Sequence, residues 1–161
     1  MVTACAAPFV VKEAVAGTPA KVEKIVIPFM RADVVNANKR MYPRKVLEVA
    51  VKAFEKQPVM GHLGMECSSI IKFDKVSHQV TNLGFRQVEG HEWLCGELKF
   101  LTTPNGRLLK EMWDAHPESV AFRTAGVGSG KVNDDGVLVV GDSYKLVAIN
   151  AISADEAVKW V

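Results

Sequence analysis

The chain of 161 residues has little of several features that would point to a class of protein. It has three cysteines, Cys5, Cys67 and Cys95. An odd number at wide spacings argues against a disulfide framework and favours a reducing compartment. The net charge is only +2, so no basic surface predicts a nucleic acid or an anionic membrane as partner. No apolar run approaches the roughly 18 residues that span a bilayer. We therefore expect a cytosolic protein with no nucleic acid and no membrane as partner.

The composition that is present is ordinary for a globular protein. Hydrophobic residues make up 48% and charged residues 24%, which excludes disorder as the main state. The length allows one domain and hardly two. Residues 1–21 are mostly small, apolar and weakly patterned. We expect them to form a flexible arm before a single folded domain of residues 22–161.

The spacing of apolar residues predicts about seven strands and two helices. The helices are expected at residues 44–57, ended by Pro58, and from the Thr103–Pro104 pair through Trp113. The strands are expected at residues 22–30, 68–73, 76–83, 93–100, 119–123, 137–140 and 144–152. Strands and helices do not alternate strictly, so the pattern favours a mixed, mainly antiparallel α+β fold, a sheet or barrel flanked by helices.

Two patterns that could bind ligands fail on their spacing. The glycine-rich residues 126–131 lack the four residues that a phosphate-binding loop has between its first glycine and its Gly-Lys pair. We interpret them as a flexible loop or hairpin. His62, His78, Cys67 and Cys95 match no zinc-ligand spacing. We therefore expect no cofactor and no metal.

The residues alone leave the two histidines open. His62 lies between two glycines in Met-Gly-His-Leu-Gly, which would leave its ring accessible, whereas a loop histidine with a local hydrogen bond is the plainer interpretation. His78 alternates with apolar neighbours and would face solvent from a strand. A catalytic histidine needs a serine or cysteine and an orienting group, which neighbouring positions in the sequence cannot show.

Several segments, taken in order, carry a resemblance to a known family. They are residues 36–43 (Asn-Ala-Asn-Lys-Arg-Met-Tyr-Pro), Gly61-His62, Val76-Ser77-His78, residues 101–106 (Leu-Thr-Thr-Pro-Asn-Gly), residues 120–126 (Val-Ala-Phe-Arg-Thr-Ala-Gly) and residues 144–152. Together they resemble the prohead (procapsid maturation) serine proteases of tailed phages. The resemblance runs from about residue 22 to the end.

The resemblance implies both a fold and a function. The fold would be a seven-stranded β-barrel flanked by helices, as in the related herpesvirus assembly proteases. The function would be that of a serine endopeptidase that cleaves scaffold, capsid protein and itself inside the phage prohead, in the host cytoplasm. His62 would be the catalytic histidine. Cleavage in the family follows glutamate, which marks Glu13 in the arm and Glu156 near the end as self-processing sites. A homodimer stays open, since the herpesvirus relatives are activated by dimerisation.

The chain departs from the family's pattern at the nucleophile. Aligning on Arg123 and Gly126 places the family's serine at position 121, where this chain has Ala121. Ser119 would lie about 6 to 7 Å away along a strand, too far to replace it without a register shift. Alanine has no lone pair to attack a carbonyl. Our hypothesis is an inactivated form of a self-cleaving protease. A naturally inactive capsid-assembly or scaffold protein, or a ligand-binding barrel with accidental motif matches, would fit the same residue.

The second departure concerns the group that orients the histidine. Asn150 stands where the family often has aspartate before a Val or Ile. An asparagine carbonyl can accept from the imidazole N–H, but it stabilises imidazolium less than a carboxylate does. Asp142 and His78 compete for this role.

The oxyanion of the reaction also needs hydrogen-bond donors. We expect a turn around Arg123, Thr124 and Gly126, in which glycine would let backbone N–H groups approach the substrate closely. The Arg123 guanidinium would either hold this loop or form a surface salt bridge.

Overall fold

The computed structural model describes residues 9–14, 21–64 and 70–157. Within these residues the elements run in the order β1 (Phe9–Ala14), β2 (Lys21–Met30), β3 (Arg40–Met41), α1 (Arg44–Lys52), β4 (Val59–His62), β5 (Val76–Val88), β6 (His91–Phe100), α2 (Pro104–Ala115), the 3-10 turn η1 (Pro117–Ser119), β7 (Val120–Val127), β8 (Gly130–Val132), β9 (Leu138–Val140), β10 (Lys145–Ser153) and the 3-10 turn η2 (Ala154–Glu156). No helix of this part of the chain is long and apolar enough to cross a membrane.

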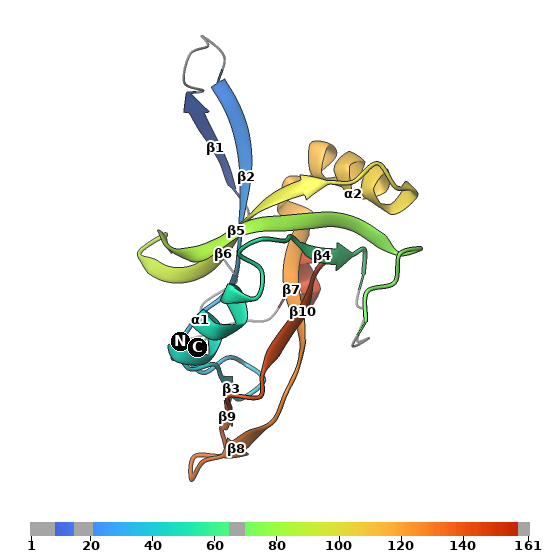
Figure 1. Ribbon diagram of the computed structural model, residues 1–161. Helices are drawn as coiled ribbons and strands as arrows, with labels where there is room; N and C mark the ends of the chain where they lie inside the picture. The colour runs from blue at the N-terminus through green and yellow to red at the C-terminus, as the bar shows by residue number, and fades with distance from the viewer. Residues whose placement is uncertain (1–8, 15–20, 65–69, 158–161) are drawn as a thin grey trace.

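The described strands form three hydrogen-bonded sheets. The largest has five strands in the order β1-β2-β6-β5-β4, the second has β3-β9-β8, and the third is the β10-β7 pair. Every pairing of these strands is antiparallel apart from that of β3 with β9. Figure 1 shows β7 and β10 running steeply away from the long β5–β6 pair toward β8 and β9.

The strand-dominated α+β class is confirmed, whereas the seven-stranded barrel is not. A barrel needs a ladder that closes on itself, and the ladders of the described strands end before they do so. The ladder between β4 and β5 shifts register between Gly61 and His62. Beyond it, β4 meets β10 through an isolated bridge from Leu63 to Ala151 and a 2.7 Å hydrogen bond from the Gly64 N–H to the Ala151 carbonyl.

One apolar core joins the sheets and both helices. Large, fully buried apolar side chains come from β2, α1, β6, α2 and β10, and they include Ile27, Leu47, Trp93, Leu94, Leu109 and Ile149. All six belong to the same cluster. The β7–β10 pair is therefore anchored to the five-stranded sheet through side chains more than through backbone pairing.

The start of α2 is fastened to the start of β5. Thr103 caps the helix by accepting a 3.0 Å hydrogen bond from the Gly106 N–H, as the Thr-Pro pair predicts. The same hydroxyl donates to the Val76 carbonyl over 2.7 Å, and the Leu101 N–H donates to the Ser77 carbonyl over 3.0 Å. These contacts fix the part of β5 that contains Ser77 and His78.

The first helix is shorter than expected. It begins after Pro43, as predicted, but ends at Lys52. Beyond this point the N–H of Phe54 donates to the Val51 carbonyl over 2.9 Å. This bond between residues three apart tightens the chain and ends the helix before Pro58 is reached.

Two predicted strands differ from the structure. Residues 70–73 of the strand expected at 68–73 are not in a strand, because the chain turns there and the Lys75 N–H donates to the Lys72 carbonyl. Residues 68 and 69 lie outside the described residues. Ser119 belongs to η1, where its hydroxyl donates to the His116 carbonyl over 2.7 Å, and β7 begins one residue later.

Two other expectations concern a hairpin and the arm. In the glycine-rich run, residues 126 and 127 still belong to β7, and Gly130 begins β8, which pairs with β9; the hairpin interpretation is therefore confirmed only for the end of the run. In the expected arm, residues 9–14 form β1, which pairs with β2. Residues 1–8 and 15–20, with Cys5, lie outside the described residues, as does Cys67.

Candidate active site

His62, at the end of β4, and Asn150, in β10, form a buried hydrogen-bonded pair. Their exposed fractions are 1% and 3%, so the accessible ring expected for His62 is wrong. The backbone N–H of His62 donates to Asn150 Oδ1 over 3.0 Å, and His62 Nδ1 lies 3.1 Å from the same atom. Because a backbone N–H can only donate, the side-chain atom that faces it must be the amide oxygen. That oxygen can only accept, so Nδ1 carries the ring proton.

The other ring nitrogen of His62 agrees with this assignment. Nε2 lies 3.0 Å from the backbone N of Lys72, which donates to it. A neutral ring with its proton on Nδ1 has its lone pair on Nε2. Three hydrogen bonds therefore specify one tautomer, with a basic nitrogen on the side away from Asn150. This is the form in which a histidine acts as a general base.

Ala121 lies on the same face of the β7–β10 pair as Asn150. The register places Arg123 opposite Asn150 and Ala121 opposite Ile152. Directly opposite residues of an antiparallel pair share a face, as do residues two apart on one strand. Ala121 and Asn150 are thus diagonal neighbours, and such residues lie about 7 to 8 Å apart, with their Cβ atoms somewhat closer. The structure therefore places position 121 and Asn150 on one face, and Asn150 contacts His62.

The two competitors of Asn150 lie elsewhere. Asp142 is exposed, in the turn between β9 and β10. His78 is fully buried in β5, so the solvent-facing position expected for it is wrong. Its Nδ1 lies 2.7 Å from Ser77 Oγ and its Nε2 lies 2.6 Å from the Ile149 carbonyl oxygen. Both ring nitrogens of His78 therefore serve groups other than His62.

His78 has the opposite tautomer to His62. The Ile149 carbonyl can only accept, so Nε2 of His78 carries the proton and Nδ1 accepts from the Ser77 hydroxyl. Burial lowers the pKa of His78 to about 4, the Ile149 hydrogen bond opposes this, and the nearby His62 lowers it further. The ring is neutral at physiological pH.

The turn expected around Arg123, Thr124 and Gly126 is wrong. All three continue β7, which pairs with β10 as far as Val127. Gly126 has a different reason to be glycine, because a Cβ there would lie 2.5 Å from the ring of Tyr144. This glycine makes room for an aromatic ring instead of opening a loop.

The described part of the chain shows no group of three or more His, Cys, Asp or Glu residues placed to hold a metal ion. Cys95 is fully buried in β6, and burial raises the pKa of its thiol to about 11. Both ligation and nucleophilic attack need the thiolate. Cys95 is therefore an inert core residue.

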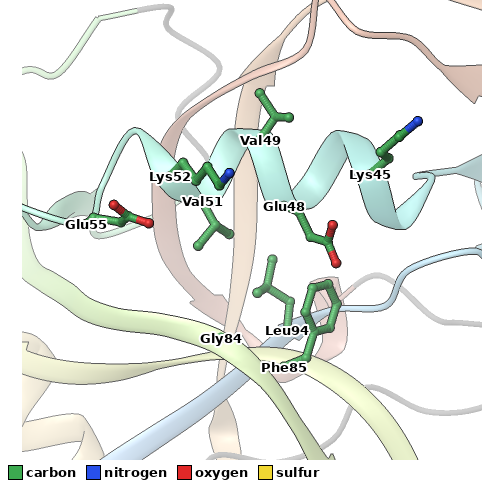
Figure 2. A pocket seen from close by; sticks show the side chains of 9 residues that line it. All are labelled: Lys45, Glu48, Val49, Val51, Lys52, Glu55, Gly84, Phe85 and Leu94. Carbon is green, nitrogen blue, oxygen red and sulfur yellow. The ribbon is translucent and has the colours of Figure 1, made fainter.

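A separate groove of about 430 Å³ lies between α1 and the β5–β6 pair. Figure 2 shows Val51 of the helix facing Leu94 and Phe85 of the sheet, with charged side chains of α1 along the rim. None of its lining residues belongs to the set of His62, Ala121 and Asn150.

The sequence gives no sign of the contact made by Lys72. Its contribution is a backbone N–H, which every residue except proline has, so no residue type marks it. Residues 70–73 were expected in a strand, which would have directed this N–H to a neighbouring strand. The long-range position of residue 72 against His62 is visible only in the structure.

Comparisons with known proteins bear on the fold and on the family of the chain. The solved structure of the bacteriophage T4 capsid assembly protease, gp21, is similar to the chain with a TM-score of 0.67 at 18% identity, covering 94% of this chain and 96% of that one. This likeness shows the fold. No curated protein sequence matches the chain significantly. The model of the prohead core protein serine protease family matches residues 17–155. The chain therefore belongs to the family of prohead core protein serine proteases.

Proposed function

We propose that position 121 is the nucleophile position of a serine endopeptidase of prohead maturation, with His62 as general base and Asn150 as the residue that orients it. The family gives the chain a protease role in the prohead. The observation that carries the finer assignment is the hydrogen bond from His62 Nδ1 to Asn150 Oδ1, on the same face as Ala121. Because this hydrogen bond keeps the ring proton on Nδ1, Nε2 of His62 is the atom that would accept a proton as the base.

With serine at position 121 the reaction would follow the ordinary acyl-transfer course. The hydroxyl proton moves to His62 Nε2 while the serine oxygen bonds to the scissile carbonyl carbon. The resulting imidazolium returns this proton to the leaving amine as the peptide C–N bond breaks. Water, activated by the same histidine, then hydrolyses the acyl-enzyme and releases the serine.

Asn150 would act by holding one tautomer in place. Replacing aspartate by asparagine in a triad is damaging when the amide presents its NH₂ group and selects the wrong tautomer. Here the backbone N–H of His62 selects the amide oxygen. Asn150 lacks the negative charge that would stabilise the imidazolium, so we expect a slower enzyme than one with a carboxylate, but one with the correct tautomer.

Oxyanion donors would come from the strand that carries position 121. β7 pairs with β10 along one edge, and no other described strand pairs with its second edge. In an antiparallel pair, alternate N–H groups point away from the partner strand. We propose that such N–H groups of β7, among residues 121–126, face the substrate carbonyl.

The substrates we propose are scaffold and capsid proteins and the chain itself. The similar bacteriophage T4 protein is a capsid assembly protease, and the family acts in the prohead core. Of the two self-processing points, Glu156 is exposed in η2, whereas Glu13 lies in β1 opposite Val22. Cleavage at Glu13 would require β1 to leave β2 first, because a protease needs an unpaired, extended segment.

Ala121 itself favours a second candidate, a capsid-assembly protein that kept the fold and lost the chemistry. In that case the lone pair on His62 Nε2 would not be needed to accept a proton from residue 121. A single restoring substitution separates the two candidates.

The restored enzyme, Ala121→Ser, should cleave itself or a glutamate-containing peptide up to about 10⁶-fold faster than the unchanged chain, because removal of the serine from a serine protease lowers kcat by about this factor. Mass spectrometry of the incubated protein measures the cleavage. The matched control is the double variant Ala121→Ser/His62→Ala, which should be inactive. A folded Ala121→Ser protein without hydrolysis would favour the inactive capsid-assembly protein.

Substitution of the orienting group should separate Asn150 from Asp142. In the Ala121→Ser background, Asn150→Ala should lower kcat on the order of a hundredfold with little change in KM, because His62 loses its tautomer and position. Asp142→Ala should leave kcat unchanged. Steady-state kinetics on one peptide measures both, and a loss of kcat in Asp142→Ala alone would reverse the assignment.

The Lys72 amide should compete with the nucleophile for His62 Nε2, since one lone pair accepts one hydrogen bond at a time. In the Ala121→Ser background, Lys72→Pro removes this N–H, whereas Lys72→Ala keeps it. A backbone hydrogen bond contributes about 1 kcal/mol net, so Lys72→Pro should raise kcat/KM about fivefold over Lys72→Ala. Equal kcat/KM values, with equal melting temperatures, would show that the amide does not compete.

A further inference from the structure

The buried ring of His78 contacts the chain at three places that matter for the site. Its Nε2 donates to the carbonyl of Ile149, the residue before Asn150. His78 is also paired with Gly61, the residue before His62, in the register of β4 with β5. Its ring also packs edge-on against Phe122, the residue after Ala121, with centroids 5.4 Å apart and planes at 80°. One side chain thus touches a direct neighbour of each of the three site residues.

Gly61 shows how tightly this contact is built. A Cβ on Gly61 would lie 2.1 Å from His78 Nε2 and 2.1 Å from the Ile149 carbonyl oxygen. Atoms do not approach so closely, so a side chain at residue 61 would clash with both partners of the His78–Ile149 hydrogen bond. Only glycine fits at this position. The contact with His78 and the Ile149 carbonyl therefore explains the glycine of the Gly61-His62 pair.

Among the described residues, backbone pairing joins the strands of the site across the two sheets through the Leu63–Ala151 bridge, with the Gly64 N–H donating to the Ala151 carbonyl. β4 and β5 belong to the five-stranded sheet, whereas β7 and β10 form a sheet of their own. The register of β4 on β5 shifts between Gly61 and His62. The His78–Ile149 hydrogen bond crosses from one sheet to the other where His62 must meet Asn150.

We propose that His78 is a positioning residue, which sets the distance between His62 and Asn150 by tying β5 to the Ile149 carbonyl beneath Gly61. The proposal rests on the proposed function for its catalytic consequence, but not for its structural one. His78 touches neither substrate nor the reacting atoms. The Ser77 hydroxyl donates to Nδ1 of His78, so the ring proton of His78 stays on Nε2, from which it donates to Ile149.

Two substitutions of His78 test the proposal. Both introduce a side-chain amide, but the two side chains differ in length. Glutamine places its NH₂ group near the position of histidine Nε2 and can still donate to Ile149. Asparagine is one methylene shorter, so it reaches only as far as Nδ1. His78→Gln should therefore keep the site in place, and His78→Asn should let β10 and β4 move apart.

The first measurement uses the chain as it is, with Ala121, and needs no catalysis. Of the four histidines, His91 and His116 are exposed, so the two buried rings give the protected ring N–H signals in ¹H–¹⁵N NMR. We expect the His62 Nδ1–H signal in the unchanged chain and in His78→Gln. In folded His78→Asn that signal should disappear or average with the other tautomer.

The second measurement is kcat in the Ala121→Ser background. His78→Asn should lower kcat on the order of a hundredfold with KM within about threefold, because misplacing a base by about 1 Å has this effect. His78→Gln should stay within about threefold of the parent. A merely structural role would lower the melting temperature and leave both kcat and the His62 signal unchanged.

Each outcome bears on the proposal. A folded His78→Asn protein that keeps the His62 Nδ1–H signal overturns it, whatever the activity. If His78→Asn does not fold, His78→Gln alone decides: an intact signal supports the proposal, and a lost signal in a folded protein overturns it. If the Ala121→Ser parent is inactive, the proposed function fails, while the NMR result still confirms or overturns the role of His78.

Discussion

The amide oxygen of Asn150 accepts two hydrogen bonds from one residue, and the chemistry of the site depends on this. The backbone N–H of His62 fixes which end of the amide faces the histidine, and the ring Nδ1–H donates to the same oxygen. Lys72 completes the arrangement at Nε2. In the proposed site a neutral amide would set the tautomer, as a carboxylate does in a Ser-His-Asp triad, although it would add no charge to stabilise the imidazolium.

The fold supports that interaction because β10 contacts both β7 and the end of β4. On one edge β10 pairs with β7, so that Asn150 and position 121 share a face. On the other side it meets β4 through Ala151, next to His62 and Leu63. Ile149, on the opposite face from Asn150, is fully buried in the common core. Apolar packing on one face of a single strand therefore holds the polar site on the other.

Local signals predicted the elements better than they predicted their closure into a sheet. Thr103 and Pro104 mark the start of α2 correctly because capping is a short-range effect. The motifs that carry the resemblance drew attention to His62, and the final strand drew attention to Asn150; the structure places the two residues in hydrogen-bond contact. What the sequence could not show is set by long-range contacts: the burial of His78, the amide of Lys72 against His62, and the pairing that turns residues 123–126 into strand.

In the proposed site, residue 121 would be the nucleophile position served by His62. The most direct measurement is covalent labelling of Ala121→Ser with a fluorophosphonate, which reacts with an activated serine oxygen and releases fluoride. Peptide mass spectrometry should find one adduct, on residue 121, and none in Ala121→Ser/His62→Ala. A folded Ala121→Ser protein that takes no label, or takes it on Ser119 or Ser77 instead, would contradict the account.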